Sequence, residues 1–175
     1  RLVPSASGVE LEIRLAANNW LPSRLPASDA NRLMTVDLDN DGALDLLAFD
    51  HEVTFWRGDG QGGFVDHTQV IGLPARATSV VAFDFDIEGD LDIASSTANE
   101  GIDLHRNSLD GPLRPIGERS LPDLEIGNVH QMFPSDLDRD GDLDLLVAHD
   151  RGLTFLRNLR QGHFEEATEA VALLE

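Results

Sequence analysis

Nine residues, Asp37 to Asp45, read DLDNDGALD, and two further stretches of the chain repeat their pattern. The second stretch begins at Asp84 and reads DFDIEGDLD, and the third begins at Asp136 and reads DLDRDGDLD. Their starts lie 47 and 52 residues apart. Internal repeats with a period of about 20 to 50 residues are typical of solenoids, propellers and repeat arrays. This repetition constrains the fold more than any other feature of the sequence.

We name these segments loop 1 (37–45), loop 2 (84–92) and loop 3 (136–144), and we number the positions of each from one to nine. Carboxylates occupy positions one, three, five and nine in all three loops, and glycine occupies position six. Like charges at such short spacing repel one another. The pattern therefore predicts either a bound cation in each loop or a strongly solvated acidic turn.

The similarity continues beyond the loops. An apolar run follows each loop, and the later segments Val53–Arg57, Ile102–Arg106 and Leu153–Arg157 align without a gap. Short apolar runs between turns rich in Gly, Asp and Asn are typical of antiparallel strands. In the first unit we expect four strands, at Arg32–Val36, Asp45–Phe49, Val53–Arg57 and Gly63–Thr68.

Four-stranded units of this length, repeated along a chain, favour the blades of a β-propeller. We therefore predict an all-β fold with three complete blades of four antiparallel strands, at residues 27–74, 75–122 and 123–175. Residues 1–26 end in the same Leu-Pro pair as the first two units and are expected to be the tail of a preceding blade. Closed propellers have about four to eight blades, so we expect a fragment of a longer chain or an assembly of copies. A β-sandwich with chance similarity is the alternative.

The charge and the missing residue types exclude several classes of function. The formal net charge is -19 at pH 7, which argues against nucleic acids and anionic membranes as partners. The chain has no Cys, which excludes disulfides, thiolate nucleophiles and Cys-ligated zinc. No apolar run approaches the roughly 18 residues that a membrane-spanning helix needs. Cations are the natural counterpart of this chain.

The acidic loops suit Ca²⁺, which takes about six to eight oxygen ligands in proteins. Side chains at alternate positions of a nine-residue loop can converge on one ion. The glycine at position six permits a sharp bend, because glycine adopts positive φ without steric cost. We expect the backbone carbonyl at position seven to add a ligand, from Ala43, Asp90 or Asp142.

Each loop begins like an EF-hand, but an EF-hand needs a glutamate at position 12, where this chain has Ala48, Ser95 or Val147. The complete pattern instead resembles the FG-GAP or VCBS repeat: D-x-D-x-D-G-x-x-D, an apolar strand, an arginine and then Gly-x-Phe. The literal Phe-Gly and Gly-Ala-Pro signatures are missing, so the bacterial-type version fits better. Repeats of this family build integrin-α-like propellers that hold Ca²⁺ in a hairpin loop of a blade.

The resemblance implies up to three Ca²⁺ ions, one in each loop. In loop 1 it implies the side-chain ligands Asp37, Asp39, Asp41 and Asp45. The matching residues are Asp84, Asp86, Glu88 and Asp92 in loop 2, and Asp136, Asp138, Asp140 and Asp144 in loop 3. Because Glu88 replaces an aspartate at position five, we expect loop 2 to bind metal more weakly.

The sequence predicts a binding module rather than an enzyme. It contains no G-x-S-x-G or H-E-x-x-H motif, and the G-x-G-x-x-G match at residues 58–63 is followed by no helix and indicates a hairpin turn. We expect a calcium-stabilised module for protein or glycan binding and adhesion, secreted to the cell surface or exterior, with the periplasm as the alternative location. Two alternatives stay open: an accessory or catalytic propeller domain of a secreted hydrolase or lyase, and a self-assembling surface or filament unit.

Overall fold

The structure is a computed structural model that describes residues 2–5, 8–16, 19–24, 31–50, 52–98, 100–117 and 120–167. Every regular element among these residues is a β-strand, which confirms the prediction of an all-β fold. Within the same residues, no helix is long and apolar enough to cross a membrane.

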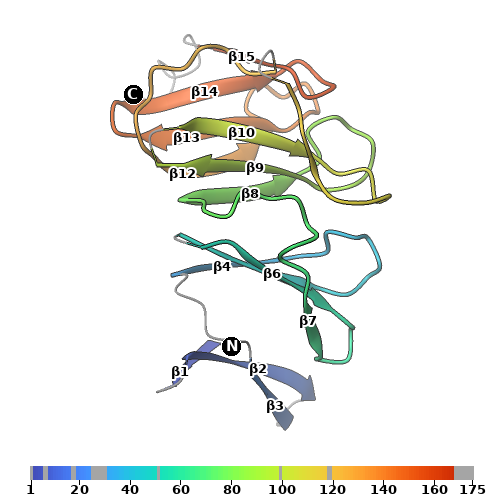
Figure 1. Cartoon of the computed structure of the whole chain (residues 1–175). Helices are drawn as coiled ribbons and strands as arrows, with labels where there is room; N and C mark the ends of the chain where they lie inside the picture. The colour runs from blue at the N-terminus through green and yellow to red at the C-terminus, as the bar shows by residue number, and fades with distance from the viewer. Residues whose placement is uncertain are drawn as a thin grey trace.

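The strands form three sheets of four strands, and each sheet is antiparallel with its strands in sequence order (Figure 1). We call these sheets blades 1, 2 and 3. Blade 1 consists of β4 (Arg32–Val36), β5 (Asp45–Phe49), β6 (Thr54–Gly58) and β7 (Phe64–Asp66). Blade 2 consists of β8 (Ser79–Phe83), β9 (Asp92–Thr97), β10 (Gly101–Arg106) and β11 (Arg114–Pro115). Blade 3 consists of β12 (Val129–Ser135), β13 (Asp144–His149), β14 (Gly152–Asn158) and β15 (Phe164–Glu166).

A smaller antiparallel sheet precedes blade 1 in the chain. Its three strands are β1 (Leu2–Ser5), β2 (Gly8–Ala16) and β3 (Asn19–Arg24). These strands lie in the region predicted to be the tail of a preceding blade, and each four-stranded sheet lies inside one of the predicted blade ranges.

The first two strands of blade 1 have the predicted bounds, whereas the fourth is shorter than predicted. It ends at Asp66 because Asp66 Oδ1 accepts the backbone N–H of Thr68 at 2.9 Å, which turns the chain. The Thr68 hydroxyl then accepts the backbone N–H of Phe55 at 2.9 Å. The His67 N–H still donates to Phe55 O at 2.9 Å, so beyond Asp66 the pairing with β6 combines one backbone bond with one side-chain bond.

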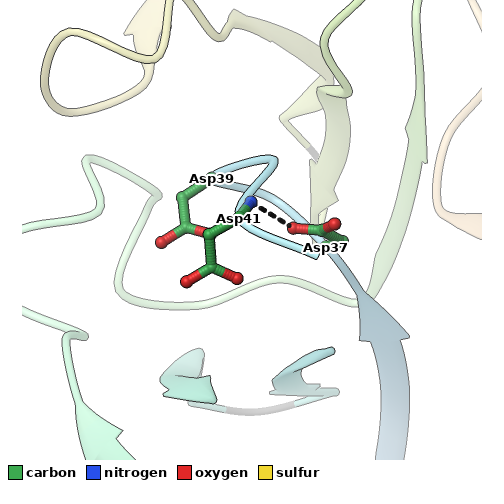
Figure 2. A group of neighbouring side chains, drawn as sticks. All are labelled: Asp37, Asp39 and Asp41. Atoms are coloured by element: carbon green, nitrogen blue, oxygen red, sulfur yellow. Dashed lines mark hydrogen bonds between the residues drawn. The ribbon is translucent and has the colours of Figure 1, made fainter. Parts of the chain in front are cut away.

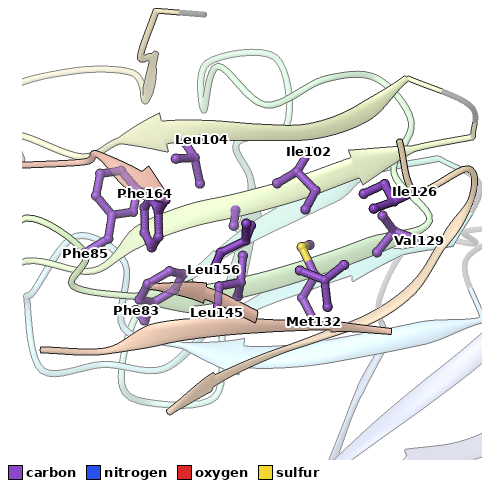
Figure 3. Close-up of a cluster of buried hydrophobic side chains, with 12 residues drawn as sticks. Phe83, Phe85, Ile102, Leu104, Ile126, Val129, Met132, Leu145, Leu156 and Phe164 are labelled. Atoms are coloured by element: carbon purple, nitrogen blue, oxygen red, sulfur yellow. The ribbon is translucent and has the colours of Figure 1, made fainter. Parts of the chain in front are cut away.

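The apolar core lies between successive blades. One cluster of buried side chains joins blades 1 and 2, and a second, larger one joins blades 2 and 3 (Figure 3). In the second cluster, Phe83, Phe85 and Phe164 meet edge to face, with ring centroids 5.8 to 6.4 Å apart. Burial of such faces against a neighbouring sheet is the main driving force for stacking repeated units.

The side chain at position two belongs to this core in loops 1 and 2. Leu38 is 3% exposed and Phe85 is fully buried, and each lies in the cluster shared with the next blade. The matching Leu137 in blade 3 is 38% exposed. Loops 1 and 2 are therefore fixed at their first turn by the following blade, and the acidic positions are placed at the edge of a blade interface.

Candidate metal centres

Each acidic loop connects the first and second strands of its blade and bends twice through the left-handed region. The position-six glycines have φ of 86°, 95° and 96° in loops 1, 2 and 3. The position-four residues Asn40, Ile87 and Arg139 also have positive φ, between 56° and 66°. A Cβ added to any of these glycines would meet nothing within 4 Å, so the backbone conformation alone requires glycine there.

The structure brings three carboxylates together in every loop, with one oxygen of each residue within 4.8 Å of the others. These groups are Asp37, Asp39 and Asp41 in loop 1, Asp84, Asp86 and Asp92 in loop 2, and Asp136, Asp138 and Asp144 in loop 3. Figure 2 shows the carboxylates of Asp39 and Asp41 side by side, while Asp37 accepts the backbone N–H of Asp41 at 3.1 Å.

Some residues predicted to be ligands lie outside these groups of three. They are Asp45 in loop 1, Glu88 and Asp90 in loop 2, and Asp140 and Asp142 in loop 3. The expected role of the position-seven carbonyls, including that of Ala43, stays a prediction. A carboxylate just outside such a group still lies in a loop of nine residues and can join a coordination shell of up to eight oxygens.

The position-nine aspartates have a structural role in the protein itself. Asp45 is fully buried, and its two oxygens accept the backbone N–H groups of Leu38 and Gly58 at 3.0 and 2.9 Å. Asp92 accepts those of Phe85 and Asn107 in the same way. In blade 3, Asp144 accepts the backbone N–H groups of Leu137 and Asn158, both at 2.9 Å. Each carboxylate therefore ties the start of its loop to the end of the third strand.

The position-one aspartates organise the turn in loops 1 and 2. Asp37 accepts the backbone N–H groups of Asp41 and Gly42 at 3.1 and 3.0 Å. Asp84 accepts those of Ile87, Glu88 and Gly89, at 2.7, 3.2 and 2.9 Å. In loop 3 the bonds run instead from the N–H groups of Asp140 and Asp142 to the carboxylates two residues before them. The carboxylates are thus oriented without a metal ion.

Loop 2 contains buried carboxylate oxygens that lack a hydrogen-bond donor. Among the described residues, both oxygens of Asp86 and Oδ1 of Asp90 have no hydrogen-bond partner. The Asp86 side chain is only 1% exposed, and Arg106 Nε lies 2.6 Å from its Oδ2 without the alignment of a hydrogen bond. Asp86 therefore has an ion-pair partner but accepts no hydrogen bond, which leaves a buried carboxylate incompletely stabilised. An oxygen-only donor set of this kind fits a hard cation such as Ca²⁺, so the residues present fit the ion that the sequence implies.

Arginine side chains lie against the acidic loops, and sequence reasoning assigned them no role. Arg57 pairs with Asp39 and Asp41, and Arg160 makes two hydrogen bonds to Asp142 at 2.9 and 3.1 Å. The Ala43 N–H, and then Arg57, lower the pKa of Asp41, and Arg160 lowers that of Asp142. An arginine at one place of all three aligned segments was the available signal for Arg57 and Arg106.

Burial has the opposite effect on the carboxylates deeper in the loops. Desolvation raises the pKa of Asp45, and it raises that of Asp90 with help from the charge of Asp86. The pKa of Asp92 rises to about 7, mainly through burial, against the hydrogen bonds from Asn107 and Phe85. Burial is the first cause of all three shifts, and the charges of neighbouring carboxylates add to each of them.

The model of the FG-GAP-like repeat matches the chain twice, at residues 37–95 and 88–147. The chain belongs to the FG-GAP-like repeat family. Both matched ranges begin in an acidic loop, so the motif that defines the repeat is the one that forms the candidate metal centres. No curated protein matches the chain.

One solved structure has a fold similar to that of this chain. It is that of a lectin from Agrocybe aegerita, described for its specific recognition of non-reducing terminal N-acetylglucosamine. The TM-score is 0.59 at 18% identity, over 91% of this chain and 46% of the lectin chain. This FG-GAP repeat chain therefore shares the propeller-like fold of that lectin and spans about half of its length.

Replacing the aspartate at position nine by asparagine should separate the structural role of this carboxylate from metal binding. We expect Asp45→Asn to lower the free energy of unfolding in chelator by about 2 kcal/mol, because an amide accepts only one of the two buried N–H groups. Asp41→Asn is the comparison at an exposed position, where the carboxylate accepts the Ala43 N–H and pairs with Arg57, and it should lower the midpoint in chelator by less. Urea unfolding of both variants measures this, and equal midpoints in chelator would contradict the structural role.

The Asp92 carboxyl should titrate near pH 7 in chelator. Because its native pKa is raised from the usual 3.8 to about 7, the native state keeps a proton that the unfolded chain has released. The stability that this proton contributes is fully present below about pH 4 and is lost as the pH rises through about 7. The ¹³C shift of this carboxyl measures the midpoint, and Ca²⁺ should move it to lower pH. A midpoint near 4 in chelator would contradict the raised pKa.

Proposed function

We propose that this chain is a calcium-stabilised propeller module that binds glycans or proteins outside the cell and has no catalytic activity of its own. The observation that carries the metal part is that each loop gathers three carboxylates with oxygens within 4.8 Å of one another. In loop 2 one of them, Asp86, is buried and accepts no hydrogen bond among the described residues. An exposed acidic turn would leave such a carboxylate in water, whereas Asp86 is buried.

Each ion would be held by the carboxylates at positions one and three of its loop, with position five or nine as the third. Bound Ca²⁺ would supply positive charge where the carboxylates repel one another. The chain's own residues supply the rest: the position-nine aspartate closes the loop, and the glycine at position six bends it. Extracellular calcium modules bind Ca²⁺ with Kd values of about 10⁻⁴ to 10⁻³ M, and we expect affinities in this range for the three loops.

The binding part of the proposal is supported by the shared fold with a glycan-binding lectin and by a crevice between blades 1 and 2. The crevice has a volume of about 520 Å³, within the usual range for small-ligand sites. Apolar Val70 and Leu109 line it together with polar Arg57, His67 and Asn107. Apolar walls with a few polar groups suit a sugar ring, which has apolar faces and hydroxyl edges.

Calcium should raise the melting temperature of the protein strongly. At a free concentration of about 100 times Kd, a single site adds about 2.7 kcal/mol to the free energy of unfolding. We expect this gain in the wild type, a smaller one in Asp39→Ala, and little effect of Mg²⁺ at the same concentration. Differential scanning calorimetry in Ca²⁺ and in chelator measures it. An unchanged melting temperature in saturating Ca²⁺ would overturn the metal part of the proposal.

Glycan binding should be detectable on immobilised sugars that end in N-acetylglucosamine, with galactose-terminated sugars as the comparison. We expect His67→Ala and Leu109→Ala to weaken binding about tenfold, as the loss of a contact of about 1.4 kcal/mol does. Leu153→Ala, on an exposed leucine outside the crevice, is the matched control. Binding that is equal in all three variants would exclude the crevice, and no binding to any sugar in Ca²⁺ would overturn the glycan part.

A further inference from the structure

Two buried asparagines, Asn107 and Asn158, join neighbouring acidic loops, and they occupy the same place at the end of the third strand in blades 2 and 3. Each is nearly inaccessible, with 4% and 2% of its surface exposed. The sequence alignment shows them only as a departure from Gly58 of blade 1. Their hydrogen bonds show what the amide does.

The side-chain amide nitrogen of each asparagine donates to two carbonyls that belong to different blades. Asn107 Nδ2 lies 3.1 Å from Leu91 O in its own loop 2 and 2.7 Å from Leu38 O in loop 1. Asn158 Nδ2 lies 3.0 Å from Leu143 O in its own loop 3 and 2.9 Å from Phe85 O in loop 2. One NH₂ group thus joins position eight of its own loop to position two of the preceding loop.

The remaining groups of each asparagine are also bonded. The backbone N–H of Asn107 donates to Asp92, and its Oδ1 accepts the N–H of Leu109 at 3.1 Å. Asn158 repeats both contacts with Asp144 and Arg160. Because both hydrogens of the amide nitrogen and the amide oxygen are used, the side chain has one orientation, and moving either loop breaks a buried hydrogen bond.

The peptide group at position two is held from both sides. The N–H of Leu38 donates to Asp45 within loop 1, and its carbonyl accepts from Asn107 of blade 2. This residue stands between the candidate ligands Asp37 and Asp39. The distance between those two carboxylates therefore depends on the docking of the next blade, and the same holds for loop 2 and blade 3.

We propose that Asn107 and Asn158 couple calcium binding at neighbouring loops, so that occupation of one loop raises the affinity of the loop next to it. This inference rests on the proposed calcium binding. An ion that orders loop 1 fixes Leu38 O, an ordered Leu38 O favours the orientation of Asn107, and Asn107 holds Leu91 and Asp92 of loop 2. Such coupling is reciprocal by thermodynamic linkage.

Blade 1 has no asparagine at the end of its third strand. Gly58 stands in place of the asparagine, and a Cβ there would collide with the carbonyl oxygen of Leu44. Leu137, at position two of loop 3, is exposed rather than buried in a blade interface. Among the described residues the coupling therefore runs between loops 1 and 2 through Asn107 and between loops 2 and 3 through Asn158.

The test is a mutant cycle read by NMR in the full chain. The amide signals of Gly42, Gly89 and Gly141 report Ca²⁺ binding at each loop separately, because each loop has one glycine at position six. Asp39→Asn with Asp41→Asn disables loop 1, and the Kd of loop 2 is measured before and after. We expect loop 2 to lose about fivefold or more in affinity, the lower end of typical couplings. An unchanged Kd would overturn the proposal.

The loss of two negative charges in loop 1 also weakens Ca²⁺ binding at loop 2, because the electrostatic attraction of the ion is smaller. The cycle is therefore repeated in the Asn107→Gly variant, in which blade 2 has the residue that blade 1 has at this place. The change in charge is the same with and without Asn107. In the Asn107→Gly background we expect the affinity of loop 2 for Ca²⁺ to fall less than twofold when loop 1 is disabled. Asn158→Gly is the matched control and should leave coupling between loops 1 and 2 intact. Equal losses with and without Asn107 would overturn the relay.

Two further readouts keep the outcomes distinct. If no glycine signal responds to Ca²⁺, the proposed metal function fails, whereas normal binding without coupling removes only the relay. If Asn107→Gly does not fold, Asn107→Ser replaces it, because a serine hydroxyl is too short to reach both carbonyls. The reduced coupling is then expected in that variant, and coupling equal to that of the wild type would overturn the relay.

Discussion

The arrangement of each acidic loop depends on one buried carboxylate, the aspartate at position nine. It is the first residue of the second strand, and its two oxygens hold backbone N–H groups from the loop and from the end of the third strand. A neutral side chain of the same size cannot accept both bonds. Because this contact closes the loop from inside, the carboxylates at positions one and three come together even though their charges repel.

The apolar interfaces supply the stability against which this repulsion acts. Leu38 and Phe85 are members of the acidic loops and also of the cores between blades. Burial of one such side chain contributes about 1.5 to 3 kcal/mol. Arginines offset part of the negative charge: Arg57 pairs with Asp41 in loop 1, and Arg106 with Asp86 in loop 2. Buried carboxylate oxygens without a hydrogen bond occur among the described residues in both loops, at Asp39, Asp86 and Asp90.

Much of the fold was predictable because the repeat places equal residues at equal positions. The bounds of β4 and β5 follow from the short apolar runs on either side of loop 1. The end of β7 was not predictable in this way, because one bond of the pairing beyond Asp66 involves the side chain of Thr68. The carboxylate groups follow from spacing within nine residues. The contacts of Asn107 and Asn158 do not, since their partners lie 69 and 73 residues away in the sequence.

The position-two side chains of loops 1 and 2 are buried by the blade on their C-terminal side. Leu38 and Phe85 are covered by the blade that comes later in the sequence, and their carbonyls accept a bond from that same blade. Loops 1 and 2 therefore gain a buried side chain and a hydrogen bond only after the next blade has folded against them. During synthesis, which proceeds from the N-terminus, position two of each of these loops stays in contact with water until the next blade has emerged. Loop 3 gathers its three carboxylates while Leu137 is exposed, so the next blade completes the burial of a loop rather than its carboxylate group.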